Sequence, residues 1–186
     1  MRYAGLCDNM EFKDKFVGFI DILGFKKLIE AHERGESPNA AELQEIVAAL
    51  GTQKDRDQFV TYGPMICPNS SRQQKDIDFH LLQISDCVIS SAEISPAGVI
   101  NLVGRAWSAA IRLLQKGLMC RGYITRGKIH HTANQVFGTG YHHAYSATEN
   151  SVTIFKKLAT EKGTPFIEID SEVVNYVDTC GDSCVA

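Results

Sequence analysis

The hydrophobic and polar positions of the chain alternate with two different periods. Short apolar runs with polar flanks predict strands, and apolar residues repeated every three or four positions predict helices. The longest helical pattern follows Ser95, a residue type that caps helices, and stops at Gly117, a residue type common just past their ends. The pattern predicts strands at 16–22, within 77–92 on both sides of residues 85–86, at 119–131 and at 165–169, and helices at 25–32, 40–50, 96–116, 139–157 and 171–177.

This order of elements predicts a single α+β domain over residues 1–186, with its core at about 16–177. Helices that alternate with hairpin-joined strands favour a sandwich in which the helices pack on one face of a mainly antiparallel sheet. Residues 52–77 are polar and contain two prolines, so we expect a surface loop there, with a short strand at 58–62. A short C-terminal tail follows the last helix.

The composition narrows the classes of partner. The formal net charge is −3, so the chain lacks the basic excess typical of a general nucleic-acid binder. No apolar run reaches the roughly 20 residues that span a bilayer, and the charged N-terminal segment lacks the apolar stretch of a secretion signal. The six cysteines have no framework spacing and are interpreted as reduced thiols. We therefore expect a cytoplasmic protein that binds neither nucleic acid nor membrane.

Two aspartates lie where predicted strands end. Asp21 ends the first apolar run, and Asp86 lies at the turn of the predicted hairpin, 65 positions later. If these strands are neighbours, the two carboxylates need a cation between them, and Mg²⁺ or Mn²⁺ binds few carboxylates together with substrate phosphates. Gly24 and Phe25 then begin a helix whose free N–H groups suit a phosphate. The alternative is that Asp21 caps this helix and Asp86 is an ordinary turn residue.

Four segments of the chain resemble the class III nucleotide cyclases. "FIDILGFKKL" (19–28) resembles the metal-binding strand-turn-helix of that family, and "LQISDCVIS" (82–90) resembles the hairpin that carries its second metal aspartate. "RGYITRGKI" (121–129) resembles the strand that follows, and "VFGTGYHHAYSA" (136–147) lies where the family begins its dimer-facing helix. Together these segments order most of residues 16–150.

The resemblance implies a fold and a set of ligands. The family fold is a ferredoxin-like α+β domain that forms a head-to-tail homodimer with active sites at the interface. Two Mg²⁺ or Mn²⁺ ions per site are implied, together with a nucleoside triphosphate substrate. The resemblance assigns Asp21, Asp86 and the backbone carbonyl of Ile22 to the metals, the amides of Gly24 and Phe25 to the triphosphate, and Arg121 to its outer phosphates, so that Asp21, Asp86 and Arg121 are the expected catalytic residues.

The base-reading and transition-state positions of the family are changed in this chain. The lysine by which adenylate cyclases read the purine falls on Leu82, and their base-reading aspartate falls on Gln135. A leucine cannot hydrogen-bond adenine, so the usual recognition of adenine is not expected. The family's catalytic asparagine aligns with His142, a candidate for the partner-facing side, and its transition-state arginine aligns with Ser146. Tyr123 is expected either in the base pocket or in the core.

A single-domain cyclase with these substitutions resembles the pyrimidine cyclases of bacterial Pycsar-type anti-phage systems. Those enzymes make cyclic UMP or cyclic CMP from UTP or CTP, and the product activates a separate effector protein. The donor that replaces the transition-state arginine stays open among Arg126, Lys128 and His142 of the partner subunit. Two other interpretations also stay open: a purine (adenylate or guanylate) cyclase with an atypical base pocket, and a catalytically degenerate nucleotide-binding dimerisation module.

Overall fold

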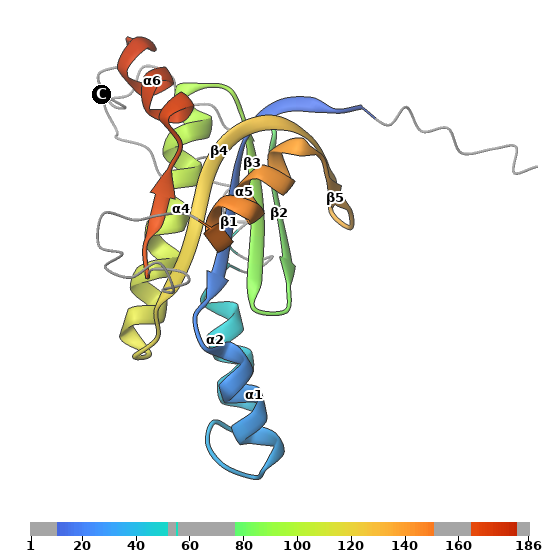
Figure 1. The fold of residues 1–186 in the computed structure, drawn as a ribbon, viewed down its shortest axis with the longest axis vertical. Coiled ribbons are helices and arrows are strands. Elements are labelled where there is room, and N and C mark those ends of the chain that lie inside the picture. Colours follow the sequence, from blue (N-terminus) through green and yellow to red (C-terminus); the bar gives the residue numbers. More distant parts are fainter. Residues whose placement is uncertain (1–10, 52–54, 56–76, 151–164, 182–186) are drawn as a thin grey trace, which may run out of the picture.

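The computed structural model describes residues 11–51, 55, 77–150 and 165–181. The described part is an α+β fold in which five helices pack around a mixed, mostly antiparallel sheet of six strands (Figure 1). The strands are β1 (Lys13–Ile22), β2 (Phe79–Ile84), β3 (Cys87–Glu93), β4 (Cys120–His131), β5 (Val136–Phe137) and β6 (Ile167–Ile169). The helices are α1 (Phe25–Glu33), α2 (Ala40–Ala48), α4 (Pro96–Gln115), α5 (Thr139–Asn150) and α6 (Ser171–Thr179).

The strand β1 lies at the centre of the sheet. The strand order is β2-β3-β1-β4-β5, and β6 pairs with β4 in parallel while the other pairs are antiparallel. β1 has a neighbouring strand on each side, and its residues 15–20 are all buried. Residues paired across the strands form rows, of which one contains Ile84, Cys87, Asp21 and Arg121 and the next contains Leu82, Ile89, Phe19 and Tyr123.

Helices cover both faces of the sheet, because successive side chains of β1 point to opposite sides. Phe16 and Ile20 lie in the larger core, which α1, α2, α4 and α6 complete; we call this side the α4 face. Val17 and Phe19 lie in the smaller core with Ala144 of α5; we call this side the α5 face. The expectation of helices on one face is therefore wrong for α5, which crosses the other side of the sheet (Figure 1).

The helix α5 approaches β4 closely and then runs along it. A Cβ added to Gly127 of β4 would lie 2.8 Å from the Cα of Gly140, so this crossing leaves no room for a side chain. Farther along the helix, Glu149 reaches Arg121 near the start of β4. The close crossing at the two glycines thus sets which residues of α5 face the strand.

The predicted elements are confirmed where the structure describes them, with small shifts at their ends. The first strand begins at Lys13 rather than at residue 16, and the two-residue strand β5 was not predicted. In the expected loop 52–77, Asp55 is helical, and the expected strand at 58–62 lies outside the described residues. Residues 151–157 of the fifth predicted helix also lie outside them.

The starts of α1 and α4 test the two helix caps that the sequence suggested. The N-cap of α1 is Gly24, with a φ of 79°, and no side chain caps this helix. The interpretation of Asp21 as a helix cap is therefore wrong. At α4 the predicted cap is confirmed, since the amide of Gly98 donates to Oγ of Ser95 at 3.0 Å.

Candidate functional site

Asp21 and Asp86 become neighbours through the pairing of β1 with β3. The amide of Ile22 donates to the carbonyl oxygen of Asp86 at 3.0 Å, and Asp21 pairs with Cys87 in the ladder. Ser85 has a φ of 53° in the tight turn that precedes Asp86. The two aspartates of the sequence prediction therefore lie together at one end of the sheet.

Arg121 lies opposite Asp21 in the ladder of β1 and β4 and binds it through two nitrogens. Its Nε and Nη2 donate to Oδ2 of Asp21 at 3.1 and 3.0 Å. The same Nη2 also donates to a carboxylate oxygen of Glu149 on α5. The side chains of Arg121, Asp21 and Glu149 are 16%, 18% and 37% exposed, so all three charges are partly withdrawn from water.

Glu149 is a member of the site that sequence reasoning missed. It lies 28 positions after Arg121, on a helix whose path over β4 depends on a close crossing at two glycines. No local pattern in the sequence indicates that contact. We refer to Asp21, Asp86, Arg121 and Glu149 as the Asp21 cluster.

Negative charge exceeds positive charge in the Asp21 cluster. Three carboxylates face one guanidinium, which leaves a formal charge of −2. Burial raises the pKa of the Asp21 carboxyl above its ordinary value; the bonded guanidinium of Arg121 opposes this rise, and the charges of Asp86 and Glu149 add to it. The Asp86 carboxylate forms no hydrogen bond or ion pair with the rest of the described residues. The cluster therefore favours the approach of a cation.

The donors of the Asp21 cluster suit a hard divalent cation. The carboxylates and the nearby backbone carbonyls offer oxygen, which Mg²⁺ and Mn²⁺ prefer. Within 11–51, 55, 77–150 and 165–181, no three His, Cys, Asp or Glu side chains are grouped so that they could hold a metal ion. Mg²⁺ commonly needs only one or two carboxylates, because water and substrate phosphates complete its ligands. The residues present thus fit a cation that a phosphate-bearing ligand helps to hold.

The start of α1 lies beside the Asp21 cluster. Gly24 turns the chain into the helix through its positive φ, and Phe25, the first helical residue, is buried in the larger core. The first amides of a helix have no acceptor within the helix, so they are available to a ligand. The structure therefore brings the predicted phosphate-binding segment next to Asp21, as the sequence indicated.

The three base-pocket candidates do not come together within one chain. Leu82 and Tyr123 share a row of the α5 face, but two strands lie between them, which is a separation of about 14 Å at ordinary strand spacing. Tyr123 donates its hydroxyl to Asp170 at 3.1 Å, and burial raises the pKa of Tyr123 to about 12. Gln135 is exposed in the connection between β4 and β5, at the far end of β4 from Arg121.

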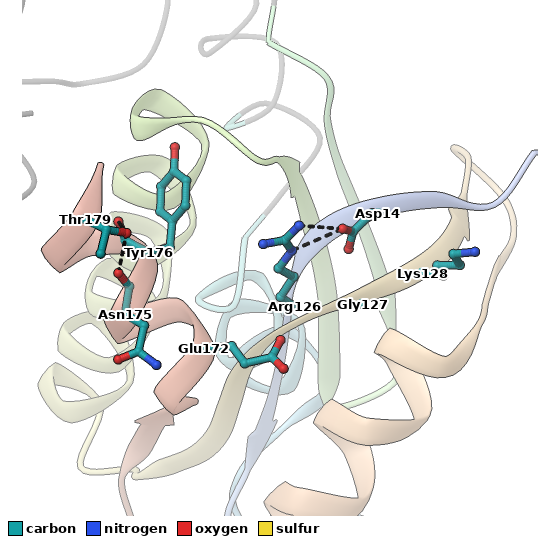
Figure 2. A pocket seen from close by; sticks show the side chains of 8 residues that line it. All are labelled: Asp14, Arg126, Gly127, Lys128, Glu172, Asn175, Tyr176 and Thr179. Atoms are coloured by element: carbon teal, nitrogen blue, oxygen red, sulfur yellow. Dashed lines mark hydrogen bonds and ion pairs between the residues drawn. The ribbon is translucent and has the colours of Figure 1, made fainter. Parts of the chain in front are cut away.

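The candidate donors for transition-state charge lie away from Asp21 of the same chain. His142 is exposed in the first turn of α5. Arg126 and Lys128 line a cleft of about 650 Å³ between β4 and α6, on the α4 face (Figure 2). There the Nε and Nη2 of Arg126 donate to Oδ2 of Asp14 at 3.1 and 2.7 Å. Within one chain, therefore, none of the three contacts the Asp21 cluster.

Comparison with known proteins adds no assignment. The chain matches no model of a known protein family, and a search of curated proteins finds no match. Among the helices of the described residues, none has both the length and the apolar composition needed to cross a bilayer. The function is therefore inferred from the Asp21 cluster and from the sequence segments around it.

Proposed function

We propose that the protein is a nucleotide cyclase that converts a pyrimidine nucleoside triphosphate, UTP or CTP, to the 3′,5′-cyclic monophosphate and pyrophosphate. The observation that carries the proposal is the meeting of Asp21 and Asp86 at the end of β1, with Arg121 beside Asp21. The resemblance of the surrounding segments to class III cyclases assigns these residues to metal and phosphate binding. The product would be a second messenger in anti-phage defence that activates a separate effector protein.

The order of the elements supports a ferredoxin-like core. From β1 to β4 the chain follows the β-α-β-β-α-β order of that fold, with α1 and α2 together in the place of the first helix. The antiparallel neighbours β2-β3-β1-β4 agree with such an order. In this proposal the cyclase is a homodimer whose active sites lie at the interface, so His142 and the base-reading residues of one chain serve the Asp21 cluster of the other.

The proposed reaction is an in-line attack of the 3′-hydroxyl on the α-phosphorus of the same nucleotide. A bond forms between the 3′-oxygen and the phosphorus, the proton of the hydroxyl passes to water, the bond to the bridging oxygen breaks, and pyrophosphate leaves. Asp21, Asp86 and the carbonyl of Ile22 would hold two Mg²⁺ or Mn²⁺ ions, which would supply a lower pKa of the hydroxyl and charge neutralisation at the leaving group. The amides at Gly24 and Phe25 orient the phosphates, and this orientation is the main task of the protein because nucleophile and electrophile share one substrate.

The chemistry of Leu82 supports a pyrimidine over a purine. Its side chain is half-buried and carries no donor or acceptor, so it offers no hydrogen bond to the edge of adenine. A buried donor or acceptor of the base that finds no hydrogen-bond partner in the pocket weakens the binding free energy by about 1–3 kcal/mol. That difference is enough to discriminate between bases. Tyr123, with its hydroxyl on Asp170, is a candidate for the wall of the pocket. A purine cyclase with an atypical pocket is the alternative that a panel of nucleotides tests.

One observation favours a second candidate function, a degenerate nucleotide-binding dimerisation module. Arg121, the expected ligand of the outer phosphates, is bonded to Asp21 and Glu149 instead. In addition, histidine and serine stand at positions 142 and 146, where the resemblance expects an asparagine and an arginine. Such a module would bind a triphosphate at the start of α1 without turning it over.

The test is to incubate the purified chain with Mn²⁺ and each of ATP, GTP, CTP and UTP, and to identify the products by mass. A single cyclic pyrimidine nucleotide is the expected product. Cyclic AMP or cyclic GMP would keep the cyclase and overturn the argument from Leu82. Binding of triphosphates without any product would favour the degenerate module.

A further inference from the structure

We propose that Arg121 is a counter-ion that occupies Asp21 until a divalent cation displaces it, and that Glu149 is the positioning residue that receives the displaced guanidinium. The identity of the cation and of its phosphate-bearing ligand rests on the proposed function. The exchange itself needs only residues of this chain and a divalent cation, and it can be measured without nucleotide.

The hydrogen bonds of Arg121 allow its guanidinium to leave Asp21 with only a small movement. Its Nη2 already contacts both carboxylates, Asp21 at 3.0 Å and Glu149 on the other side. The guanidinium can therefore give up Oδ2 of Asp21 and keep its bond to Glu149. Only the side chain of Arg121 has to move. The backbone positions of Arg121 and Asp21 stay opposite each other in the ladder of β1 and β4.

The charges of the Asp21 cluster set the direction of the exchange. With a formal charge of −2 the cluster has an uncompensated excess that one divalent cation balances. A cation bound to Asp21 repels a guanidinium on the same oxygen, since like charges in contact in a poorly hydrated site are strongly unfavourable. Glu149 offers the displaced guanidinium a carboxylate within reach, and without that carboxylate the displacement would leave a half-buried cation unpaired.

The exchange also prepares Arg121 for phosphate. A guanidinium has five N–H donors in a fixed fork. Held by Glu149 through Nη2, it regains Nε for a new acceptor when Asp21 takes the cation. Arg121 would thus bind outer phosphates only when the cation is in place, which couples the two events.

A second arginine–aspartate pair on the same two strands is a matched control. Arg126 binds Asp14 with the same two nitrogens on one oxygen, at 3.1 and 2.7 Å. These side chains are 39% and 43% exposed and lie on the α4 face, with no further carboxylate bonded to Arg126 among the described residues. The pair therefore has the bond geometry of the Asp21 pair without its burial or its excess charge.

The experiment is to titrate Mn²⁺ into the protein without nucleotide and to follow free Mn²⁺ by electron paramagnetic resonance. Arg121→Gln should tighten Mn²⁺ binding by about tenfold, because the competing cation is gone. Glu149→Gln should weaken binding by about threefold or more, because the displaced guanidinium loses its acceptor. Arg126→Gln should leave the Mn²⁺ affinity measured without nucleotide unchanged, because Arg126 lies on the opposite face of the sheet and a donor to the transition state has no ligand in this measurement. Circular dichroism checks that each variant is folded.

A variant that combines Arg121→Gln with Glu149→Gln tests whether Glu149 acts by positioning Arg121 or only through its own negative charge. If Glu149 acts through Arg121, Glu149→Gln changes Mn²⁺ affinity less in the Arg121→Gln background than in the natural chain. An equal factor in both backgrounds would overturn the role of Glu149, and no gain of affinity in Arg121→Gln would overturn the role of Arg121. These readouts need no turnover, so they can hold in a protein that makes no cyclic nucleotide, and they can fail in one that does.

Discussion

Two groups of charged residues lie on the α5 face of the sheet, and they differ in how their charges are balanced. In the second group Asp78 binds Lys15 at 2.6 Å, Lys13 at 3.2 Å and His80 at 3.0 Å; we call these four residues the Asp78 cluster. Lys15 and Asp21 point to the same side of β1 and are six positions apart, about 20 Å along the strand. Each cluster joins strands across the sheet.

The clusters differ in how far neighbouring positive groups balance the charge of the central aspartate. Hydrogen bonds from His80, and then from Lys15 and Lys13, hold the pKa of Asp78 well below its ordinary range, although burial opposes this. In the Asp21 cluster burial raises the pKa of Asp21, the charges of Asp86 and Glu149 add to this rise, and the single guanidinium of Arg121 opposes it. A carboxylate with a full set of partners stabilises the fold, whereas an undercompensated carboxylate is typical of a functional site.

The largest expected effect is on turnover. Asp21→Asn should lower cyclase turnover at least about a thousandfold, the order expected when an electrostatic stabiliser of the transition state is lost. The free energy of unfolding should change by less than about 1 kcal/mol, since Arg121 keeps its bond to Glu149. Product assays and denaturant titrations measure the two quantities. A folded variant that keeps a tenth of the turnover would contradict this role of Asp21.

The second effect is on stability. Asp78→Asn should lower the free energy of unfolding by about 3 kcal/mol, because it leaves the charge of Lys15 buried without its partner. Turnover of the folded protein should stay the same. Lys13→Gln is the matched control, and with a side chain 52% exposed it should cost less than about 1 kcal/mol. Equal losses in both variants would show that burial of Lys15 is not the cause.

The third effect is a decrease in the free energy of unfolding at acidic pH. Since the pKa of Asp78 is lower in the folded than in the unfolded chain, the unfolded chain takes up the proton first. This contribution is complete above the unfolded value of about 4 and is lost as the pH falls toward the folded value. Denaturant midpoints measured between pH 5 and pH 2 should fall less steeply in Asp78→Asn than in the natural chain. Parallel curves would remove Asp78 as the source of the acid sensitivity.

The smallest effect is expected at the exposed pair of Arg126 and Asp14. Asp14→Asn should change the free energy of unfolding by less than about 1 kcal/mol, because both partners are more than a third exposed. Turnover should be unaffected if the cleft beside α6 is separate from the active site. A loss of turnover without a loss of stability would instead give Arg126 a role in the partner's site. Urea midpoints and product assays on the same preparation distinguish these results.

The fold was largely predictable, because its signals are local. The apolar run of β1 and the cap at Ser95 act over a few residues, and both are confirmed. The alternation of side chains along β4 also predicts that Arg121 and Arg126, five positions apart, point to opposite faces.

The members of the two clusters were harder to predict. The proximity of Asp21 and Asp86 depends on which strands pair, and the order of elements indicated the pairing of β1 with β3 correctly. Glu149 was missed because its position depends on the path of α5 over β4. Lys15 belongs to the polar flank of the first apolar run, yet it is 3% exposed and lies within β1. Its partner Asp78 directly precedes β2, a strand two places away from β1 in the sheet, so no local pattern indicates this contact.

The decisive measurement for a cyclase is the stoichiometry of products from UTP and CTP in the presence of Mn²⁺. A cyclase that works through Asp21 and Asp86 should release one pyrophosphate for each 3′,5′-cyclic monophosphate, and Asp21→Asn should release neither. Inorganic phosphate with a linear nucleotide, or equal product from the variant, would show that the protein is not a cyclase acting through Asp21.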